Sequence, residues 1–319
     1  MITGLRRSSL YVPGDSEKML RKSVAISADL LLLNLEDGVA STKKDEAREN
    51  VAQSLRNLEF GSREIVVRIN SIDSEIGRKD LAAIVPCRPD GICLPKVESA
   101  AEIRAADIAV LELEQGYGID EGELRFHAMI ESARGLLQAP AIAAASPRLA
   151  TLIFGSADYI KDVRCHPGED RVELLLALEQ IVIAARAAGI EAIDAPCFEL
   201  RDQERLRREA TQARRIGFDG KNALHPSQLE VINEVFDVTS DEIAWAEKVV
   251  AELNQAETRG RALSTLDGQL IDNPHRAAAD RILRRAGLAK GSLTPFPVFP
   301  DKTGRIVRTK TGKKRETSG

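Results

Sequence analysis

Short apolar runs alternate with longer stretches of helical spacing through most of the chain, and this alternation constrains the fold more than any other feature. Apolar runs of this kind are typical of strands buried on both faces, as in a parallel sheet covered by helices. Eight runs are expected to be strands: Ser9–Val12, Leu30–Leu35, Ile65–Ile69, Gly91–Leu94, Phe126–Ile130, Leu149–Phe154, Glu191–Ile193 and Gly217–Gly220. Eight strand–helix units in series predict an α/β protein with a closed (β/α)8 TIM barrel.

Composition agrees with a buried parallel sheet. The chain is 43% hydrophobic but only 4% aromatic, so its core must consist mainly of Ala, Leu, Ile and Val. Segments such as Lys43–Leu58 and Val172–Ala188 have the apolar spacing of helices, whereas the link between the fourth and fifth runs is the least clearly patterned. No glycine-rich dinucleotide motif follows the first run, which argues against an open doubly wound sheet.

The pattern changes after His225, and three regions are expected. Residues 1–235 form the TIM-barrel catalytic domain, residues 236–290 a C-terminal helical lid, and residues 291–319 a flexible basic tail. The lid is too short for a core of its own, so we expect it to pack on the barrel or on a neighbouring subunit. Its predicted elements are a helix, a turn or short hairpin and a second helix, at Ser240–Asn254, Leu263–Asp272 and Pro274–Ala286.

Charge and cysteine usage exclude several classes of protein. The net charge of −4 gives no indication of a nucleic-acid or membrane partner. The N-terminus lacks the apolar core of a signal peptide, and no run reaches the ~20 apolar residues of a membrane span. The cysteines form no C-x-x-C pair, which disfavours a zinc or redox site, and scattered thiols fit a cytoplasmic protein. They are Cys87, Cys93, Cys165 and Cys197.

Charged or polar residues follow almost every predicted strand. In strand order they are Glu36 and Asp37, Arg68 and Asn70, Lys96, Glu131, Asp158, Asp194, and then Lys221 and His225. The carboxyl ends of the strands of a parallel barrel converge on one face, where barrel enzymes carry their chemistry. The sequence therefore predicts an active site on this face.

Two of these carboxylates, Glu131 and Asp158, follow neighbouring strands and could approach one cation. Two carboxylates with water and substrate oxygens are a usual set of ligands for Mg²⁺. His225 is the only histidine expected at a strand end, which disfavours zinc or iron. The alternative is that Arg68, Lys96 or Arg134 holds the two carboxylates in ion pairs.

An ordered series of motifs runs through residues 6–287: RRSSLYVPGDSEKMLRK, LEDGVASTKKDEAR, IVVRIN, CLPKVESAAEI, MIESARGLL, FGSADY, AIDAPCFELRD, GFDGKNALHPSQ and LDGQLIDNP. In this order they resemble the citrate lyase β-subunit-like family, part of the aldolase superfamily related to HpcH/HpaI. That family includes malyl-CoA and citramalyl-CoA lyases. The first two motifs look most like those of citramalyl-CoA lyase of the mitochondrial type.

The resemblance implies roles at matching positions of the barrel. Glu131 and Asp158 would bind Mg²⁺, and Arg68 would lie beside the metal and contact the substrate. Glu36, Asp37 and Lys96 would surround and support these residues. Tyr11, Lys18 and Lys22 would contact the substrate or its CoA portion, and the loop of Leu224, His225 and Pro226 would run along CoA.

The resemblance also implies an assembly. Asp272 matches an acid that the C-terminal lid of a neighbouring subunit delivers to the site, so a homotrimer is expected. The chain departs from the family pattern at Asn34, where relatives usually have aspartate, which removes one negative charge near the metal side of the site. Ser132 and Leu224 replace the usual threonine and isoleucine and are mild changes.

The expected reaction is Mg²⁺-dependent cleavage of a 3-hydroxyacyl-CoA, such as citramalyl-CoA or malyl-CoA. The products would be acetyl-CoA and an α-keto acid, pyruvate or glyoxylate. Arg68 would stabilise the enolate oxygen, and Asp272 would protonate the enolate carbon. Three alternatives remain: a citrate lyase β-subunit acting on a carrier-bound citryl thioester, a malyl-CoA thioesterase, and a non-catalytic protein that binds RNA or a partner through its basic tail.

Overall fold

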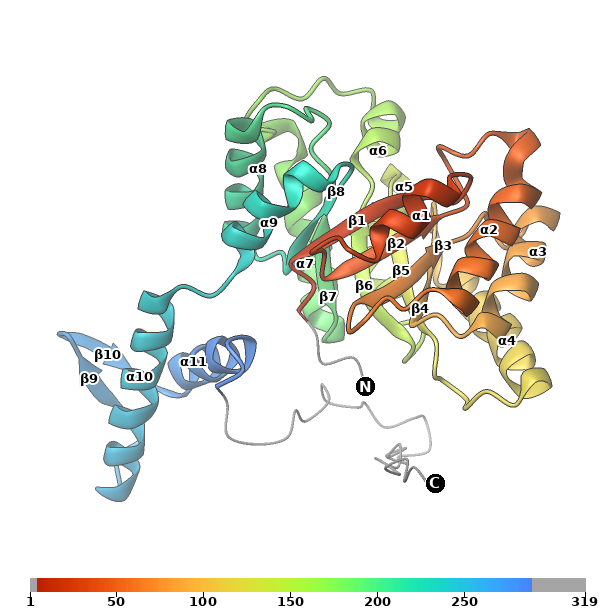
Figure 1. The fold of residues 1–319 in the computed structure, drawn as a ribbon. Coiled ribbons are helices and arrows are strands. Elements are labelled where there is room, and N and C mark those ends of the chain that lie inside the picture. The colour runs from red at the N-terminus through yellow and green to blue at the C-terminus, as the bar shows by residue number, and fades with distance from the viewer. Residues whose placement is uncertain (1–4, 289–319) are drawn as a thin grey trace. The chain divides into compact units, whose positions relative to one another are not determined.

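The structure is a computed structural model that describes residues 5–288. Eight parallel strands close into a barrel because β1 pairs with both β2 and β8, so the predicted TIM-barrel fold is confirmed (Figure 1). The strands are β1 (Ser8–Pro13), β2 (Leu30–Asn34), β3 (Glu64–Arg68), β4 (Gly91–Leu94), β5 (Arg125–Ile130), β6 (Leu149–Phe154), β7 (Glu191–Asp194) and β8 (Gly220–Ala223).

Helices follow the strands and cover the outside of the barrel (Figure 1). The α-helices of this part are α1 (Glu17–Ser23), α2 (Lys44–Asn57), α3 (Glu75–Ile84), α4 (Ala100–Tyr117), α5 (Ala133–Ala143), α6 (Ser156–Val163), α7 (Leu175–Ala188), α8 (Gln203–Ile216) and α9 (Leu229–Phe236). Short 3₁₀ turns are η1 (Ser41–Lys43), η2 (Val85–Cys87), η3 (Val172–Leu174) and η4 (Pro226–Gln228).

Strands such as β2 are apolar along most of their length because both of their faces are buried. In β2, Leu30 and Leu32 belong to the cluster that fills the barrel, whereas Leu31 and Leu33 belong to the layer between barrel and helices. Successive side chains of a strand point to opposite faces, which produces this alternation. The uninterrupted leucines of the sequence therefore reflect two cores that share one strand.

The weakly patterned link between the fourth and fifth strands is the long helix α4. Ser99 begins it, with its side chain accepting a hydrogen bond from the N–H of Glu102. Gly118 ends it in the left-handed conformation, at φ +66. Acidic and apolar residues are interspersed along this helix, so its apolar spacing is weak although both of its caps are clear.

The eighth strand is a wrong prediction, because it begins at Gly220 rather than at Gly217. Gly217 has φ +114 and ends α8, and its N–H returns to the carbonyls of Ala213 and Arg214. The sequence interpretation took this helix cap for the start of a strand. Gly220 itself has a different constraint, since a Cβ there would lie 1.8 Å from the carbonyl oxygen of Arg6.

Beyond the barrel, residues 240–288 form a second compact unit. It contains α10 (Ser240–Thr258), a hairpin of β9 (Ser264–Leu266) and β10 (Gln269–Ile271), and α11 (Asn273–Arg285). Contrary to expectation, it has a small apolar cluster of its own, made of Ala246, Val249, Leu253, Ile271 and Ala279. The predicted tail lies outside the described residues. No helix within residues 5–288 is long and apolar enough to cross a membrane.

The amino ends of the strands carry a buried cluster of charges. Glu64 begins β3 and Glu191 begins β7, and the guanidinium of Arg6 binds both carboxylates. Nε2 of His127 lies 3.4 Å from Glu64, and burial lowers the pKa of His127. Burial alone would raise the pKa of Glu64, but hydrogen bonds and charges from His127 and Arg6 outweigh it and lower that pKa to about 2.

This cluster predicts a specific dependence of stability on pH. A carboxyl group with a lowered pKa stabilises the fold above its unfolded pKa of about 4.5, and its contribution is lost as the pH falls toward about 2. Over this window the wild type should lose about 3 kcal/mol relative to Glu64→Gln. Urea unfolding at successive pH values measures the difference, with Glu59→Gln as the exposed control. Parallel pH curves for wild type and Glu64→Gln would contradict it.

Candidate active site

Five adjacent strands, β2 to β6, bring the candidate residues to one edge of the barrel. Glu36 and Asp37 follow β2, Arg68 is the last residue of β3, and Glu131 follows β5. Three of these side chains are buried although they are charged, with exposures of 7% for Glu36, 5% for Arg68 and 4% for Glu131. Buried charges need partners, so their contacts define how the site is built.

Lys96 joins the two sides of this group. Its main-chain N–H donates to Oε1 of Glu131 at 2.7 Å, while its ammonium donates to Glu36 and Asp37 at 2.7 Å each. The backbone of Lys96 is in the left-handed region, at φ 50, which is unfavourable for a residue with a Cβ. Strain of this kind persists where the surrounding contacts hold it, often at functional sites.

Arg68 lies between the same carboxylates. Its Nη2 is 2.7 Å from Oε2 of Glu36 and 3.8 Å from Oε1 of Glu131. Its guanidinium carbon lies 5.9 Å from the centre of the Tyr11 ring. Its Nε is buried and has no hydrogen-bond partner among the described residues.

Part of the alternative interpretation, in which ion pairs hold the two carboxylates, is present in the structure, because Arg68 does pair with Glu131. The side chain of Arg134 instead lies 3.9 Å from Glu98.

Gly155 determines where the other side of the Glu131 carboxyl can lie. A Cβ at this position would come 2.3 Å from Oε2 and 2.5 Å from Cβ of Glu131, so only glycine allows the present packing. Gly155 is also the N-cap residue of α6, and Asp158 lies in the first turn of that helix. A negative charge is favourable at a helix N-terminus. The Glu131 carboxyl group therefore lies against the residue that begins α6, the helix whose first turn carries Asp158.

The electrostatics of Glu131 suit a divalent cation. Burial raises its pKa most, Arg68 and the Lys96 N–H oppose this effect, and Glu36 and Asp158 raise the pKa further, to about 7. Two ionised carboxylates close to each other repel, and a cation between them would offset this repulsion. The donors are oxygens, which suits a hard ion such as Mg²⁺. Within residues 5–288 no group of three or more His, Cys, Asp or Glu side chains is arranged to hold a metal.

The loop after β2 is held by hydrogen bonds from the side chains of Asn34 and Lys44 to its main chain. Asn34 accepts from the N–H of Glu36 at 3.1 Å and donates from Nδ2 to the carbonyl of Asp37. Lys44 donates to the carbonyls of Leu35 and Glu36 at 2.7 and 2.8 Å. An ionised aspartate at position 34 could not donate to the Asp37 carbonyl. The departure from the family pattern therefore has a structural role in this chain.

Three residues of the opening motif lie at the same side of the barrel. Tyr11 is on β1, its hydroxyl lies 3.9 Å from Sδ of Met129, and burial raises its pKa above the ordinary value. Lys18 and Lys22 are one turn apart on α1, and both are exposed. Tyr11 therefore lies beside Arg68, whereas the two lysines project from the helix that follows.

The loop after β8 is organised by Gln228, a residue that the sequence interpretation did not single out. Its Oε1 accepts from the N–H groups of Leu224 and His225 at 2.9 and 3.3 Å, and its Nε2 donates to the carbonyl of Cys197 at 2.9 Å. His225 and Pro226 are exposed at the start of η4. Gln228 is the last residue of the motif GFDGKNALHPSQ, and this position was the sequence signal that could have identified it.

Asp194 and Lys221 do not reach the open face, although each was expected there. Both side chains are fully buried, and Nζ of Lys221 lies 2.7 Å from Oδ2 of Asp194. Arg171 lies 3.0 Å from the same carboxylate, and Glu209 is 3.3 Å from Lys221. Lys221 and Asp194 thus belong to a structural ion-pair cluster rather than to the candidate site.

Asp272 belongs to the second unit, where it is the N-cap residue of α11. Its Oδ1 lies 2.7 Å from Nδ1 of His275, and both side chains are partly exposed. The chain's own fold thus presents this carboxyl group at a helix start. His275 was not considered from the sequence, although its position three residues after an aspartate was a visible signal.

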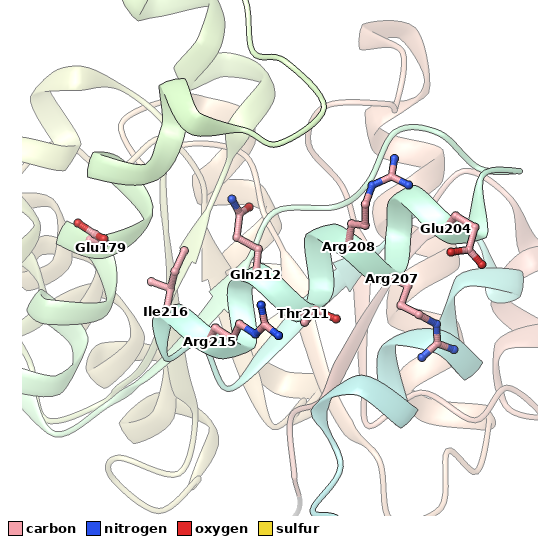
Figure 2. A pocket seen from close by; sticks show the side chains of 8 residues that line it. All are labelled: Glu179, Glu204, Arg207, Arg208, Thr211, Gln212, Arg215 and Ile216. Carbon is pink, nitrogen blue, oxygen red and sulfur yellow. The ribbon is translucent and has the colours of Figure 1, made fainter.

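A groove on the outside of α7 and α8 holds about 610 Å³ (Figure 2). Its arginines are partly engaged already, because Arg207 pairs with Glu234 and Arg208 with Glu169, at 2.7 and 3.1 Å. It is lined by Glu179, Glu204, Arg207, Arg208, Thr211, Gln212, Arg215 and Ile216, and none of these is a predicted site residue. The charges at the strand ends, rather than this groove, define the candidate active site.

A TIM barrel with buried carboxylates, an arginine and a lysine at the carboxyl ends of its strands is the architecture of a barrel enzyme. The family model described as HpcH/HpaI aldolase/citrate lyase matches residues 7–226, and a model described as a C-C bond lyase of the TIM-barrel fold matches residues 174–289. The chain belongs to the HpcH/HpaI aldolase/citrate lyase family.

Two relatives illustrate the range of this family. The chain is 37% identical to the citrate lyase subunit beta of Leuconostoc mesenteroides over 282 residues, which cover 88% of this chain and 93% of that protein. It is 36% identical to a (3S)-malyl-CoA thioesterase of Cereibacter sphaeroides over 280 residues, which cover 88% and 94%.

A solved structure is similar over nearly the whole chain. It is CitE from Mycobacterium tuberculosis in complex with magnesium, acetoacetate and coenzyme A, with a TM-score of 0.71 and 30% identity, covering 90% of this chain and all of that one. The predicted family resemblance is confirmed by these comparisons.

Gly155→Ala should displace the Glu131 carboxyl, since the added methyl cannot fit beside it. We expect a loss of about 1–3 kcal/mol in the free energy of unfolding, because the surroundings must shift to accept the methyl group. Chemical denaturation measures this loss. The matched control is Gly116→Ala in α4, where no atom lies within 4 Å of the new Cβ. Equal stability of the two variants would show that the site is looser than described.

Proposed function

We propose that this chain is a Mg²⁺-dependent carbon–carbon lyase that cleaves a 3-hydroxyacyl-CoA to acetyl-CoA and an α-keto acid. The observation that carries the proposal is the set of Arg68, Glu131 and Asp158 at the carboxyl ends of β3, β5 and β6. Membership of the HpcH/HpaI aldolase/citrate lyase family supports it. CitE, a similar structure, was solved with magnesium, acetoacetate and coenzyme A.

In the proposed site, Glu131 and Asp158 hold the ion. When bound, Mg²⁺ supplies a Lewis acid and a template for the carboxylate and carbonyl oxygens of the keto acid. The N–H of Lys96 holds Oε1 of Glu131 at 2.7 Å, which fixes the orientation of this ligand. Glu36, Asp37 and the ammonium of Lys96 form the surrounding charges that keep the ligand and Arg68 in position.

Arg68 stabilises the charge that develops when the bond breaks. Cleavage between the α and β carbons leaves a thioester enolate, whose oxygen carries negative charge mainly in the transition state. A guanidinium stays protonated and presents a fixed set of donors, which suits this role. The Nε of Arg68 is buried and has no partner among the described residues, so the guanidinium keeps one donor that the rest of the barrel does not use.

The remaining residues bind the substrate and complete the proton transfer. Tyr11, Lys18 and Lys22 supply hydrogen bonds and positive charge for the acyl-CoA, and the loop of Leu224, His225 and Pro226 lies along CoA. Asp272 protonates the enolate carbon, delivered by the lid of a neighbouring subunit in a homotrimer. We place the reaction in the cytoplasm, which the four free cysteines support.

Two other outcomes are favoured by specific relatives. Similarity to citrate lyase subunit beta favours cleavage of a citryl thioester on a carrier protein, and similarity to (3S)-malyl-CoA thioesterase favours release of free CoA. A panel of citramalyl-CoA, malyl-CoA and citryl-CoA in both configurations tests all three. Acetyl-CoA with a keto acid supports the lyase, free CoA supports the thioesterase, and no turnover of any free CoA ester contradicts both.

The metal ligands generate the next prediction. Glu131→Gln and Asp158→Asn should abolish turnover and weaken Mg²⁺ binding together, because each removes one of two anionic ligands. Isothermal titration with Mg²⁺ measures binding without depending on activity. The matched control is Glu98→Gln, a carboxylate after β4 that contacts Ser132 instead. Full turnover of the wild type in excess chelator would refute the metal assignment.

Asp272→Asn should reduce kcat by about 10²–10⁴-fold while KM for the acyl-CoA stays nearly constant, because it removes a proton donor rather than a binding group. Steady-state kinetics separates these two parameters. Because asparagine also caps helices well, α11 should remain folded, which circular dichroism checks. An increase in KM at constant kcat would assign Asp272 to binding instead.

A further inference from the structure

Asp272 and His275 form a side-chain pair at the start of α11. Nδ1 of the histidine lies 2.7 Å from Oδ1 of the aspartate, and the Asp272 N–H donates to the same nitrogen at 3.3 Å. The exposed fractions of the two side chains are 45% for Asp272 and 44% for His275. The pair is thus in direct contact and also open to water.

The fold holds this pair in one arrangement. Ile271, immediately before Asp272, is buried in the apolar cluster of the second unit together with Ala279 of α11. Pro274 occupies the first turn of the helix, where its fixed φ favours the helical start. Because both sides of the pair are anchored, Asp272 and His275 keep their one-turn spacing without contributions from other segments.

The other nearby base is already engaged. Arg276, the next residue along the helix, donates to Asn254 at 2.9 Å and to Glu257 at 3.3 Å, both on α10. Its guanidinium therefore ties α11 to α10. His275 is thus the basic side chain that contacts the Asp272 carboxyl group.

A capping role alone does not require histidine. Glutamate and glutamine are the usual residues three positions after an N-cap, because their side chains accept a hydrogen bond from the cap N–H. Histidine adds a second ring nitrogen and exchanges protons near neutral pH. With Nδ1 2.7 Å from the Asp272 carboxyl group and the ring half exposed, the imidazole can exchange protons both with that carboxyl group and with water.

We propose that His275 is a positioning and proton-relay residue for Asp272, which rests on the function proposed above. In cleavage, the Asp272 O–H bond breaks as the C–H bond forms at the enolate carbon, leaving a carboxylate. The Nδ1–H of an imidazolium then gives its proton to Oδ1, which leaves a neutral ring with its Nε2–H and a bare Nδ1 that accepts the Asp272 N–H. A proton from water or a buffer acid returns to Nδ1 of the half-exposed ring before the next turnover. In condensation the same protons move in the opposite direction, so each turnover leaves the pair unchanged.

The relay is tested on proton exchange into the methyl group of acetyl-CoA. The full-length chain with Mg²⁺ is incubated with acetyl-CoA in D₂O, and deuterium incorporation is followed by NMR beside steady-state cleavage kinetics. His275→Gln keeps an acceptor for the cap N–H but has no group that gains or loses a proton near neutral pH. His275→Ala leaves space for imidazole added to the solution. Arg281→Gln, an exposed change on the same helix, is the matched control.

We expect His275→Gln to lower kcat and the exchange rate by about tenfold or more, with KM within about twofold of the wild type. Added imidazole should restore exchange to His275→Ala but not to Asp272→Asn. Arg281→Gln should behave as the wild type. A purely structural cap would give the opposite pattern, because glutamine would then replace histidine without loss and imidazole would restore nothing.

Two results overturn the relay alone: wild-type kinetics in His275→Gln, or a slow His275→Ala that imidazole does not rescue. A wild type that neither cleaves any CoA ester nor exchanges acetyl-CoA protons refutes the proposed function, and the relay with it. Circular dichroism of each variant separates loss of α11 from loss of the proton path, because only a folded variant counts toward either conclusion.

Discussion

A buried carboxyl group, that of Glu131, is the constraint on which the open end of the barrel depends. It accepts the Lys96 N–H at 2.7 Å on one oxygen, and its other oxygen lies against Gly155, where no Cβ can fit. In this arrangement the backbone of Lys96 is in the left-handed conformation, which is unfavourable for a residue with a Cβ. Because burial raises the pKa of Glu131 to about 7, the group is unstable as a bare anion and suits a bound cation.

The charges around Glu131 divide into two sets. Arg68 and Lys96 carry two positive charges and contact Glu36 and Asp37, which carry two negative ones. Glu131 and Asp158 then remain as the carboxylates whose charge the protein offsets least, and a divalent ion has the charge needed to balance them. The ion pairs of Arg68 and Lys96 with Glu36 and Asp37 thus surround the two carboxylates that we propose as metal ligands.

Much of this could be predicted from the sequence because it depends on strand order. The apolar bodies of the strands and the charged residues that follow them are enough to place Glu36, Arg68 and Glu131 on one face. The family resemblance, which the comparisons confirm, gave the expected roles. Those roles remain proposals, since geometry alone brings residues together without testing what they do.

The rest could not be predicted because it depends on side-chain direction and backbone conformation. Asp194 and Lys221 follow the same pattern as the site residues, yet both point into the layer beneath the helices and pair there. Gly217 was predicted to begin a strand because the sequence does not show that its backbone is in the left-handed conformation. Asn34 seemed a lost carboxylate, whereas its amide donates to a carbonyl that an aspartate could not serve.

The charged cluster at the amino ends of the strands, made of Arg6, Glu64 and Glu191, affects how ligands can reach the barrel. A barrel of this kind is filled rather than hollow, and these ion pairs close its far end with charges that already satisfy one another. Ligands would therefore enter and leave the barrel only at the carboxyl ends of its strands. A molecule bound over this open end would have to dissociate before one bound beneath it. A bulky product that carries a nucleotide would therefore delay the release of a smaller product.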